Sequence, residues 1–130
     1  MARLYHVDIA RHAAAADHKW VDNLLSHYEL PGVEGGRQGS PRRISIDGIQ
    51  HIALVRLLTQ ELDLSVRSAV RLATRLLVAN SSPIGLEGGL ELRLDLERFR
   101  SNMQALIADG VESVTPARRG RPRKSRPARQ

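Results

Sequence analysis

Two breaks rich in glycine and proline, at residues 31–41 and 80–89, divide the sequence into three blocks. Glycine and proline favour turns and loops, and a proline inside a regular element removes a backbone donor. Neither a helix nor a central strand is therefore expected to run through these breaks. The chain is expected to form short elements in a front block, a middle block and a back block.

Composition restricts both the core and the chemistry of these blocks. A chain of 130 residues suits one domain with one core, and only 3% of them are aromatic. The core must therefore consist of leucine, isoleucine, valine and alanine, which favours helices. The sequence has no cysteine, which excludes disulfides, cysteine-bound zinc, iron–sulfur clusters and a cysteine nucleophile.

The front block predicts two short helices joined by a tight turn. The alanine-rich residues 7–16 suit the first helix, and Asp17 is a suitable N-cap for the second. In the second helix four apolar residues recur at helical spacing and form the expected buried stripe: Val21, Leu24, Leu25 and Tyr28. The polar residues left on its outer face are His18, Lys19, Asp22, Asn23 and Ser26.

A hairpin is expected at the end of the front block, and the middle block then predicts two helices. Residues 33–46 contain three glycines and a proline before an alternating isoleucine pair, which favours a loose β-hairpin. A helix is then expected to begin at Asp47, with Asp47 and Gln50 as a variant capping box, and to continue to Leu62. Its expected apolar residues are Ile49, Ile52, Ala53, Leu57 and Leu58. Ser65 is a plausible cap for the next helix, whose expected inward stripe is Val66, Ala69, Val70, Ala73, Leu76 and Leu77.

The back block predicts a second hairpin and a final helix. Apolar residues alternate over 84–94 on both sides of Gly88-Gly89, as in two short strands joined by a turn. The amphipathic pattern that starts at Leu96 predicts a helix, which is expected to end at Asp109-Gly110.

The positive charge is concentrated at the C-terminal end of the sequence. The net charge is +6, but residues 116–130 alone carry seven basic and no acidic residues, which leaves thirteen basic and fourteen acidic residues over 1–115. This tail has three prolines and no large apolar residue, so it is expected to be disordered when free. Its charge predicts a polyanionic partner.

The order helix, helix, glycine-rich hairpin, helix, helix resembles the winged helix-turn-helix of the MerR-like DNA-binding family. The residues that carry the resemblance are Tyr5-His6-Val7, Ala10, residues 19–28 as the recognition helix, residues 37–46 as the wing, and the phrase RRISIDGIQHIALVRLLTQELDLSVRSAV. The resemblance implies a mainly α fold with a winged helix-turn-helix domain over residues 1–78 and a small β-hairpin wing. It also implies a hairpin and helix extension over 79–115 for dimerisation or partner binding, before the basic tail at 116–130.

The resemblance implies that two groups of residues contact DNA. The groove of B-DNA admits one helix, in which an asparagine can pair with adenine and a lysine with guanine or a phosphate, whereas Asp22 on the same face is expected to repel phosphate. The expected groove residues are His18, Lys19, Asn23 and Ser26, and the expected wing contacts to phosphates or a narrow minor groove are Arg37, Gln38, Arg42 and Arg43. The same residues also fit an ordinary solvated helix face and a hairpin charged for solubility.

A further basic stripe is expected along the fourth helix. Arg67, Arg71 and Arg75 are spaced four residues apart and share one helix face. This stripe fits a solvated surface as well as a site for phosphate or a partner.

The strongest local motif is in the tail. Residues 119–124 resemble the AT-hook, a minor-groove binding motif with Gly-Arg-Pro at its centre. Glycine allows close backbone approach, proline holds an extended path, and arginines lie along a narrow A·T-rich groove. The residues expected to do this are Arg119, Gly120, Arg121, Pro122, Arg123 and Lys124. Nonspecific attraction to the phosphates of DNA or RNA is the alternative.

The residues do not favour an enzyme. The five histidines are scattered, and the weak pair His18 and Asp22 is the nearest approach to a metal motif. The sequence contains neither a phosphate-binding glycine loop nor a nucleophile elbow, so no catalytic residue, metal or cofactor is expected. It also has no membrane-length apolar run and no secretory core at its start, so a cytoplasmic protein on the nucleoid, without membrane contact, is expected.

These features together predict a sequence-specific transcriptional regulator, acting as a repressor, that binds double-stranded DNA as a homodimer. One recognition helix reads only a few base pairs, so useful specificity needs two half-sites. Three alternatives stay open. The protein is an antitoxin that binds a cognate toxin and represses its own operon, an architectural protein of the nucleoid, or a protein-interaction module whose tail binds RNA.

Overall fold

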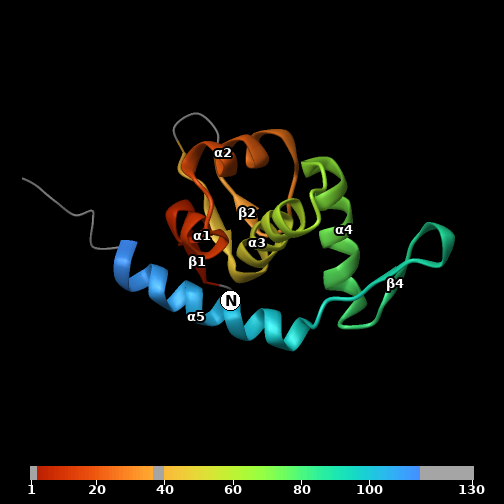
Figure 1. Cartoon of the computed structure of the whole chain (residues 1–130). Coiled ribbons are helices and arrows are strands. Elements are labelled where there is room, and N and C mark those ends of the chain that lie inside the picture. The colour runs from red at the N-terminus through yellow and green to blue at the C-terminus, as the bar shows by residue number, and fades with distance from the viewer. Residues whose placement is uncertain (1–2, 37–39, 115–130) are drawn as a thin grey trace, which may run out of the picture.

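The computed structural model describes residues 3–36 and 40–114, over which the chain is mainly helical, with five α-helices and five short strands (Figure 1). The mainly α expectation is confirmed. The elements follow one another as β1 (Leu4–His6), α1 (Val7–Ala14), α2 (His18–His27), β2 (Val33–Glu34), β3 (Arg43–Ser45), α3 (Ile46–Glu61), α4 (Val66–Ala79), β4 (Ile84–Gly85), a 3-10 turn (Glu87–Gly89), β5 (Glu91–Leu92) and α5 (Leu96–Val114).

A three-stranded antiparallel sheet in the order β1-β3-β2 joins the start of the chain to the hairpin. The predicted hairpin is confirmed, since Val33 of β2 pairs with Ile44 of β3. Strand β1 was not predicted as a strand. Its Tyr5 pairs with the same Ile44, and both side chains are buried on one face of the sheet. A strand of three residues whose partner lies about forty positions away leaves no local periodicity to recognise.

Helix α3 lies at the centre of the molecule, packed against α1, α4 and β3 (Figure 1). Of the expected apolar residues all but Leu57, which is 38% exposed, are buried, and the helix buries more than these, because every residue from Gly48 to Val55 is buried. The expected cap is wrong. The helix begins at Ile46, and the Ser45 Oγ, not Asp47, accepts a hydrogen bond from the Gly48 amide at 3.2 Å.

Helix α4 and the second hairpin follow the sequence prediction. Ser65 caps α4 by accepting from the Ser68 amide at 3.2 Å, and Ala69, Ala73 and Leu76 form its buried stripe. Strands β4 and β5 pair across a turn in which Gly88 and Gly89 have positive φ, a conformation that glycine adopts without strain. This hairpin projects away from the helical body (Figure 1).

Helix α5 continues past the residues where its end was expected. Gly110 does not terminate the helix, which extends to Val114, but lies buried where α5 crosses α1. A Cβ at this position would lie 3.2 Å from the His12 Cδ2. The neighbouring Asp109 Oδ2 lies 2.6 Å from the His12 Nε2. The Asp-Gly pair therefore allows close contact between two helices, which a pattern along one helix does not reveal.

The apolar face of α5 belongs to the main core. Leu96, Phe99, Met103 and Ile107 are buried in the same cluster as residues of α1, α3 and α4. The division of function after residue 78 stays a prediction, but in packing the two segments share one core. None of the helices within 3–36 and 40–114 has the length and apolar character needed to cross a membrane.

Candidate nucleic-acid interface

Helix α2 is held by local hydrogen bonds and by a buried back face. As predicted, the Asp17 carboxylate caps it by accepting from the Trp20 amide at 2.7 Å. The turn before it places Ala15 in the left-handed region at φ 53°, where its amide bonds to the His12 carbonyl. Val21 and Leu24 are buried beneath the helix, and therefore its opposite face is held outward in a defined orientation.

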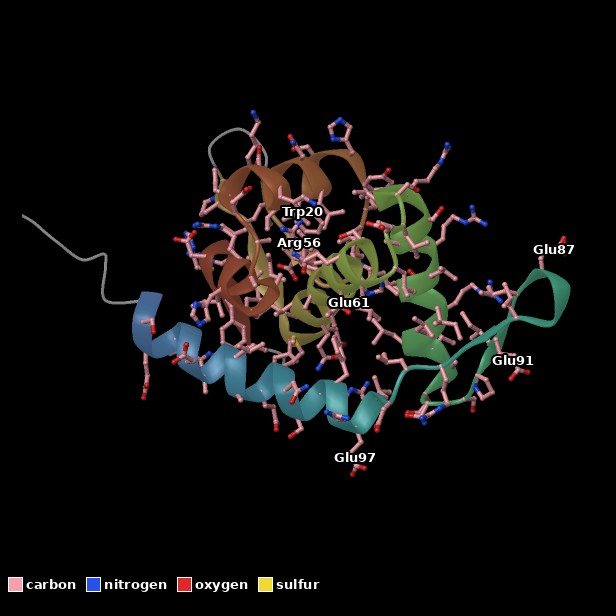
Figure 2. The ribbon with its side chains drawn as sticks, in the orientation of Figure 1. Trp20, Arg56, Glu61, Glu87, Glu91 and Glu97 are labelled. Carbon is pink, nitrogen blue, oxygen red and sulfur yellow. The ribbon has the colours of Figure 1, made fainter. Side chains whose placement is uncertain are left out.

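The four expected groove residues all lie on that outer face. His18, Lys19, Asn23 and Ser26 are exposed. Helix α2 lies at the edge of the molecule (Figure 1), whereas the labelled Glu87, Glu91 and Glu97 are on the hairpin and α5, away from α2 (Figure 2). The surface around α2 is therefore separated from these carboxylates.

An ion pair joins α2 to the hairpin. The Arg42 guanidinium donates from Nη1 to the Asp22 Oδ1 at 2.6 Å and from Nη2 to the Ser26 Oγ at 3.3 Å. The hydrogen bond from Arg42, with the charge of that residue, lowers the pKa of the Asp22 carboxyl. Asp22, which was expected to repel phosphate, thus holds its negative charge next to a cation. Arg42, whose expected phosphate contact stays a prediction, holds this hairpin to α2.

The backbone of the hairpin makes room for this arginine. Gly36 has a φ of 91°, and a Cβ there would lie 2.9 Å from the Arg42 Nε. The Gly36 amide donates to the Ser40 carbonyl at 2.9 Å and brings the two sides of the hairpin together. The Asp22–Arg42 link joins residues 20 positions apart, and no spacing signal in the sequence could have identified it.

The other expected contacts are only partly described. Arg43 is exposed on β3. Arg37 and Gln38 lie outside the described residues, as do the AT-hook-like residues Arg119, Gly120, Arg121, Pro122, Arg123 and Lys124. The expected stripe of Arg67, Arg71 and Arg75 is exposed along α4, and Arg75 donates to the Gly85 carbonyl at 3.2 Å.

A cavity that sequence reasoning missed lies beside α2. It has a volume of about 500 Å³ and is bounded by α2, the residue that follows it and the first turn of α4. Its lining residues are Trp20, Asn23, Leu24, His27, Tyr28, Val66 and Arg67. Since α2 and α4 are separated by a hairpin and a long helix, only the tertiary fold brings these side chains together.

Among the histidines, His51 has a structural role in this arrangement. Within the part of the chain that the structure describes, no group of three histidine, aspartate or glutamate side chains is placed to hold a metal ion. His51 is buried between α3 and α4, and its Nε2 lies 3.0 Å from the Thr74 Oγ1. The Thr74 hydroxyl donates its proton to the Val70 carbonyl, so its oxygen accepts from the His51 Nε2. Burial lowers the pKa of His51 despite the opposing charge of Asp47.

Comparison with known proteins adds no family to this description. The sequence matches no protein-family model, a search of curated proteins found no match, and a search of solved structures found none either.

Proposed function

We propose that this protein is a sequence-specific DNA-binding transcriptional regulator of the MerR-like winged helix-turn-helix class, acting as a homodimeric repressor. The observation that carries the proposal is the exposed polar face of α2, anchored from behind by Val21 and Leu24 and joined to a hairpin by Arg42. From α1 onward, the order α1-α2-β2-β3-α3-α4 agrees with the order of helix, helix, hairpin, helix and helix that carries the resemblance, which supports the winged-helix assignment.

The geometry of α2 suits insertion into the major groove. Its ten residues span about 15 Å, a length that a groove about 12 Å wide accommodates. In this proposal the exposed Asn23 pairs with an adenine, and the exposed Lys19 pairs with a guanine or a phosphate. Because the Asp22 carboxylate is paired with Arg42, the outer face presents Lys19 and His18 to the polyanion without an unpaired carboxylate at its centre.

The proposal is tested by selecting duplexes from a random library with the full chain and footprinting the selected sequence. We expect a discrete palindromic footprint, because a symmetric dimer reads two half-sites. Asn23→Ala is expected to weaken binding to the selected site roughly 5- to 150-fold per half-site, the value of about 1–3 kcal/mol for one good base contact. Gln104→Ala, at an exposed position on α5, is the matched control and should leave affinity unchanged.

Two footprint results would contradict the proposal. Diffuse protection of A·T-rich DNA would favour an architectural protein, and no protection would favour a protein-interaction module. The contribution of the tail is measured separately by ending the chain after Thr115. If all seven tail cations neutralise phosphates, this truncation lowers the slope of log affinity against log salt by roughly six. An unchanged slope would exclude the tail from binding.

The second candidate function is an autoregulating antitoxin. It is favoured by the projecting hairpin and the end of α4, where Leu90 and Val78 are 66% and 79% exposed. Apolar side chains exposed this far on a projecting element fit a protein partner. Co-expression with the product of the adjacent gene tests this function. Stable copurification that Leu90→Asp abolishes, with DNA binding retained, would support it.

A further inference from the structure

We propose that the cavity between α2 and α4 binds a small molecule that joins a flat apolar ring to an anionic group, and that this molecule competes with DNA for α2. The site itself stands on the geometry of the cavity, whereas the competition rests on the proposed DNA-binding function.

The size and lining of the cavity fit such a ligand. Its volume of about 500 Å³ falls within the range of about 300–1,000 Å³ that is typical of small-molecule sites. Trp20, Leu24, Tyr28 and Val66 supply aromatic and aliphatic surface. Flat ligands stack on rings of this kind in offset or edge-to-face arrangements.

The Trp20 ring is held in place by a contact outside the cavity. The Arg56 guanidinium carbon lies 4.9 Å from the ring centroid, and the two side chains lie next to each other between α2 and α3 (Figure 2). Arg56 is not among the residues that line the cavity. This cation–π contact therefore orients the indole from outside and leaves surface for a ligand.

The polar lining residues select an anion. None of the seven lining residues is acidic, and Arg67 is the arginine among them. Within residues 3–36 and 40–114, Arg67 has neither a hydrogen-bond nor an ion-pair partner. A guanidinium binds a carboxylate through two parallel hydrogen bonds, which makes a carboxylate the expected anionic group. His27 donates from Nδ1 to the Asn23 carbonyl at 2.8 Å, which leaves Nε2 as the ring nitrogen available to a ligand.

The position of the cavity makes a ligand a competitor of DNA. Asn23 is both a lining residue and the proposed adenine contact. An occupant in contact with Asn23 and a duplex that uses the same side chain exclude each other. When the ligand concentration is well above the dissociation constant of the ligand, the apparent dissociation constant for DNA should rise in proportion to the ratio of these two values.

The single tryptophan of the sequence, Trp20, provides a direct readout. The full chain is titrated with 3-phenylpropanoate and with its neutral counterpart 3-phenylpropanamide, with excitation at 295 nm. We expect a saturable change in Trp20 fluorescence with the carboxylate, and at least tenfold weaker binding of the amide, as the loss of a charge-assisted hydrogen bond implies. Arg67→Ala should remove this tenfold preference, whereas the exposed Arg98→Ala on α5 should retain it.

Several results would overturn the inference. The absence of a saturable change up to about 10 mM, a concentration that detects even weak millimolar binding, would exclude the site. Equal binding of acid and amide would exclude the role of Arg67. In a third outcome, the parent chain binds neither probe and Arg67→Ala weakens DNA binding. This outcome would show that the cavity is part of the DNA contact surface and not a ligand site.

A separate measurement distinguishes this inference from the proposed function. The fluorescence titration uses no DNA, so it tests the site even if the chain binds no duplex. If the carboxylate binds but leaves affinity for the selected duplex unchanged, the competition is overturned. If the duplex binds and neither probe does, the site is overturned while the proposed function stands.

Discussion

Replacing Phe99 with alanine tests whether α5 is an integral part of the fold. Phe99 is 5% exposed and lies in the core cluster shared by α1, α3 and α4. Deleting a buried phenylalanine ring costs about 3–5 kcal/mol of unfolding free energy. Phe99 also borders an open cavity of about 490 Å³ beside α1 and α3, where water can enter the space left by the ring. We therefore expect a loss near the lower end, about 3 kcal/mol.

A loss of this size is readily measured. The expected loss is a large share of the total unfolding free energy, which is about 5–15 kcal/mol for a typical domain. It corresponds to a decrease in Tm of about 12 °C for a chain of this length. Urea unfolding is followed by circular dichroism and by the fluorescence of Trp20, which lies in α2 and outside α5. Both signals should move to lower urea together, because one core unfolds as one unit.

The control is Leu90→Ala, at a residue that is 66% exposed on the projecting hairpin, which should change stability by no more than about 0.5 kcal/mol. The reasoning would be refuted if Phe99→Ala cost less than about 1 kcal/mol, far below the range for a buried ring. It would also be refuted if the Trp20 transition were unaffected while the dichroism transition shifted, since α5 would then unfold separately from the front of the molecule.

Three further predictions follow from the packing. Gly48→Ala should destabilise by about 1–3 kcal/mol in thermal melts despite the better helix propensity of alanine, because a Cβ there would lie 2.7 Å from the Ile44 Cγ2, whereas Gly85→Ala, with nothing within 4 Å, is the neutral control. Burial lowers the pKa of His51, so the unfolded chain binds more protons below the ordinary value of about 6.5. The contribution of His51 to the unfolding free energy should be complete above that pH and should decrease as the pH falls towards the folded pKa. In urea titrations at pH 5 and 7, His51→Gln should lack this part of the pH dependence. An equal change of unfolding free energy with pH in the two chains would contradict the prediction. Finally, Arg42→Ala should raise the pKa of the Asp22 carboxyl back towards its ordinary value in an NMR titration, and an unchanged titration would show that the pair does not form in solution.

The elements that were predicted correctly depend on neighbours in sequence. Asp17 and Ser65 are caps because each side chain reaches an amide three residues ahead. The glycines at 88 and 89 turn the second hairpin because they adopt positive φ. The polar face of α2 follows from the helical spacing of its buried residues.

The elements that were predicted wrongly depend on distant partners. Helix α3 buries Gln50 and His51 as well as its apolar residues because α1, α4 and β3 surround its start, and a pattern along the helix does not reveal how many sides are covered. Gly110 looks like a helix terminator, but His12 from the other end of the chain occupies the space a side chain would need. Asp22 looks like a free charge until Arg42 reaches it from the hairpin.

The sequence by itself therefore determined the mainly helical class, the caps, the hairpin turns, the outward residues of α2 and the concentration of charge in the tail. Each of these arises from backbone hydrogen bonding or side-chain periodicity over a few residues. Only the tertiary structure decided that Asp22 is paired with Arg42, that α5 belongs to the core, and that an aromatic cavity with an arginine lies beside α2. Those features need contacts between residues that are far apart in the chain, and such contacts form only when the helices pack.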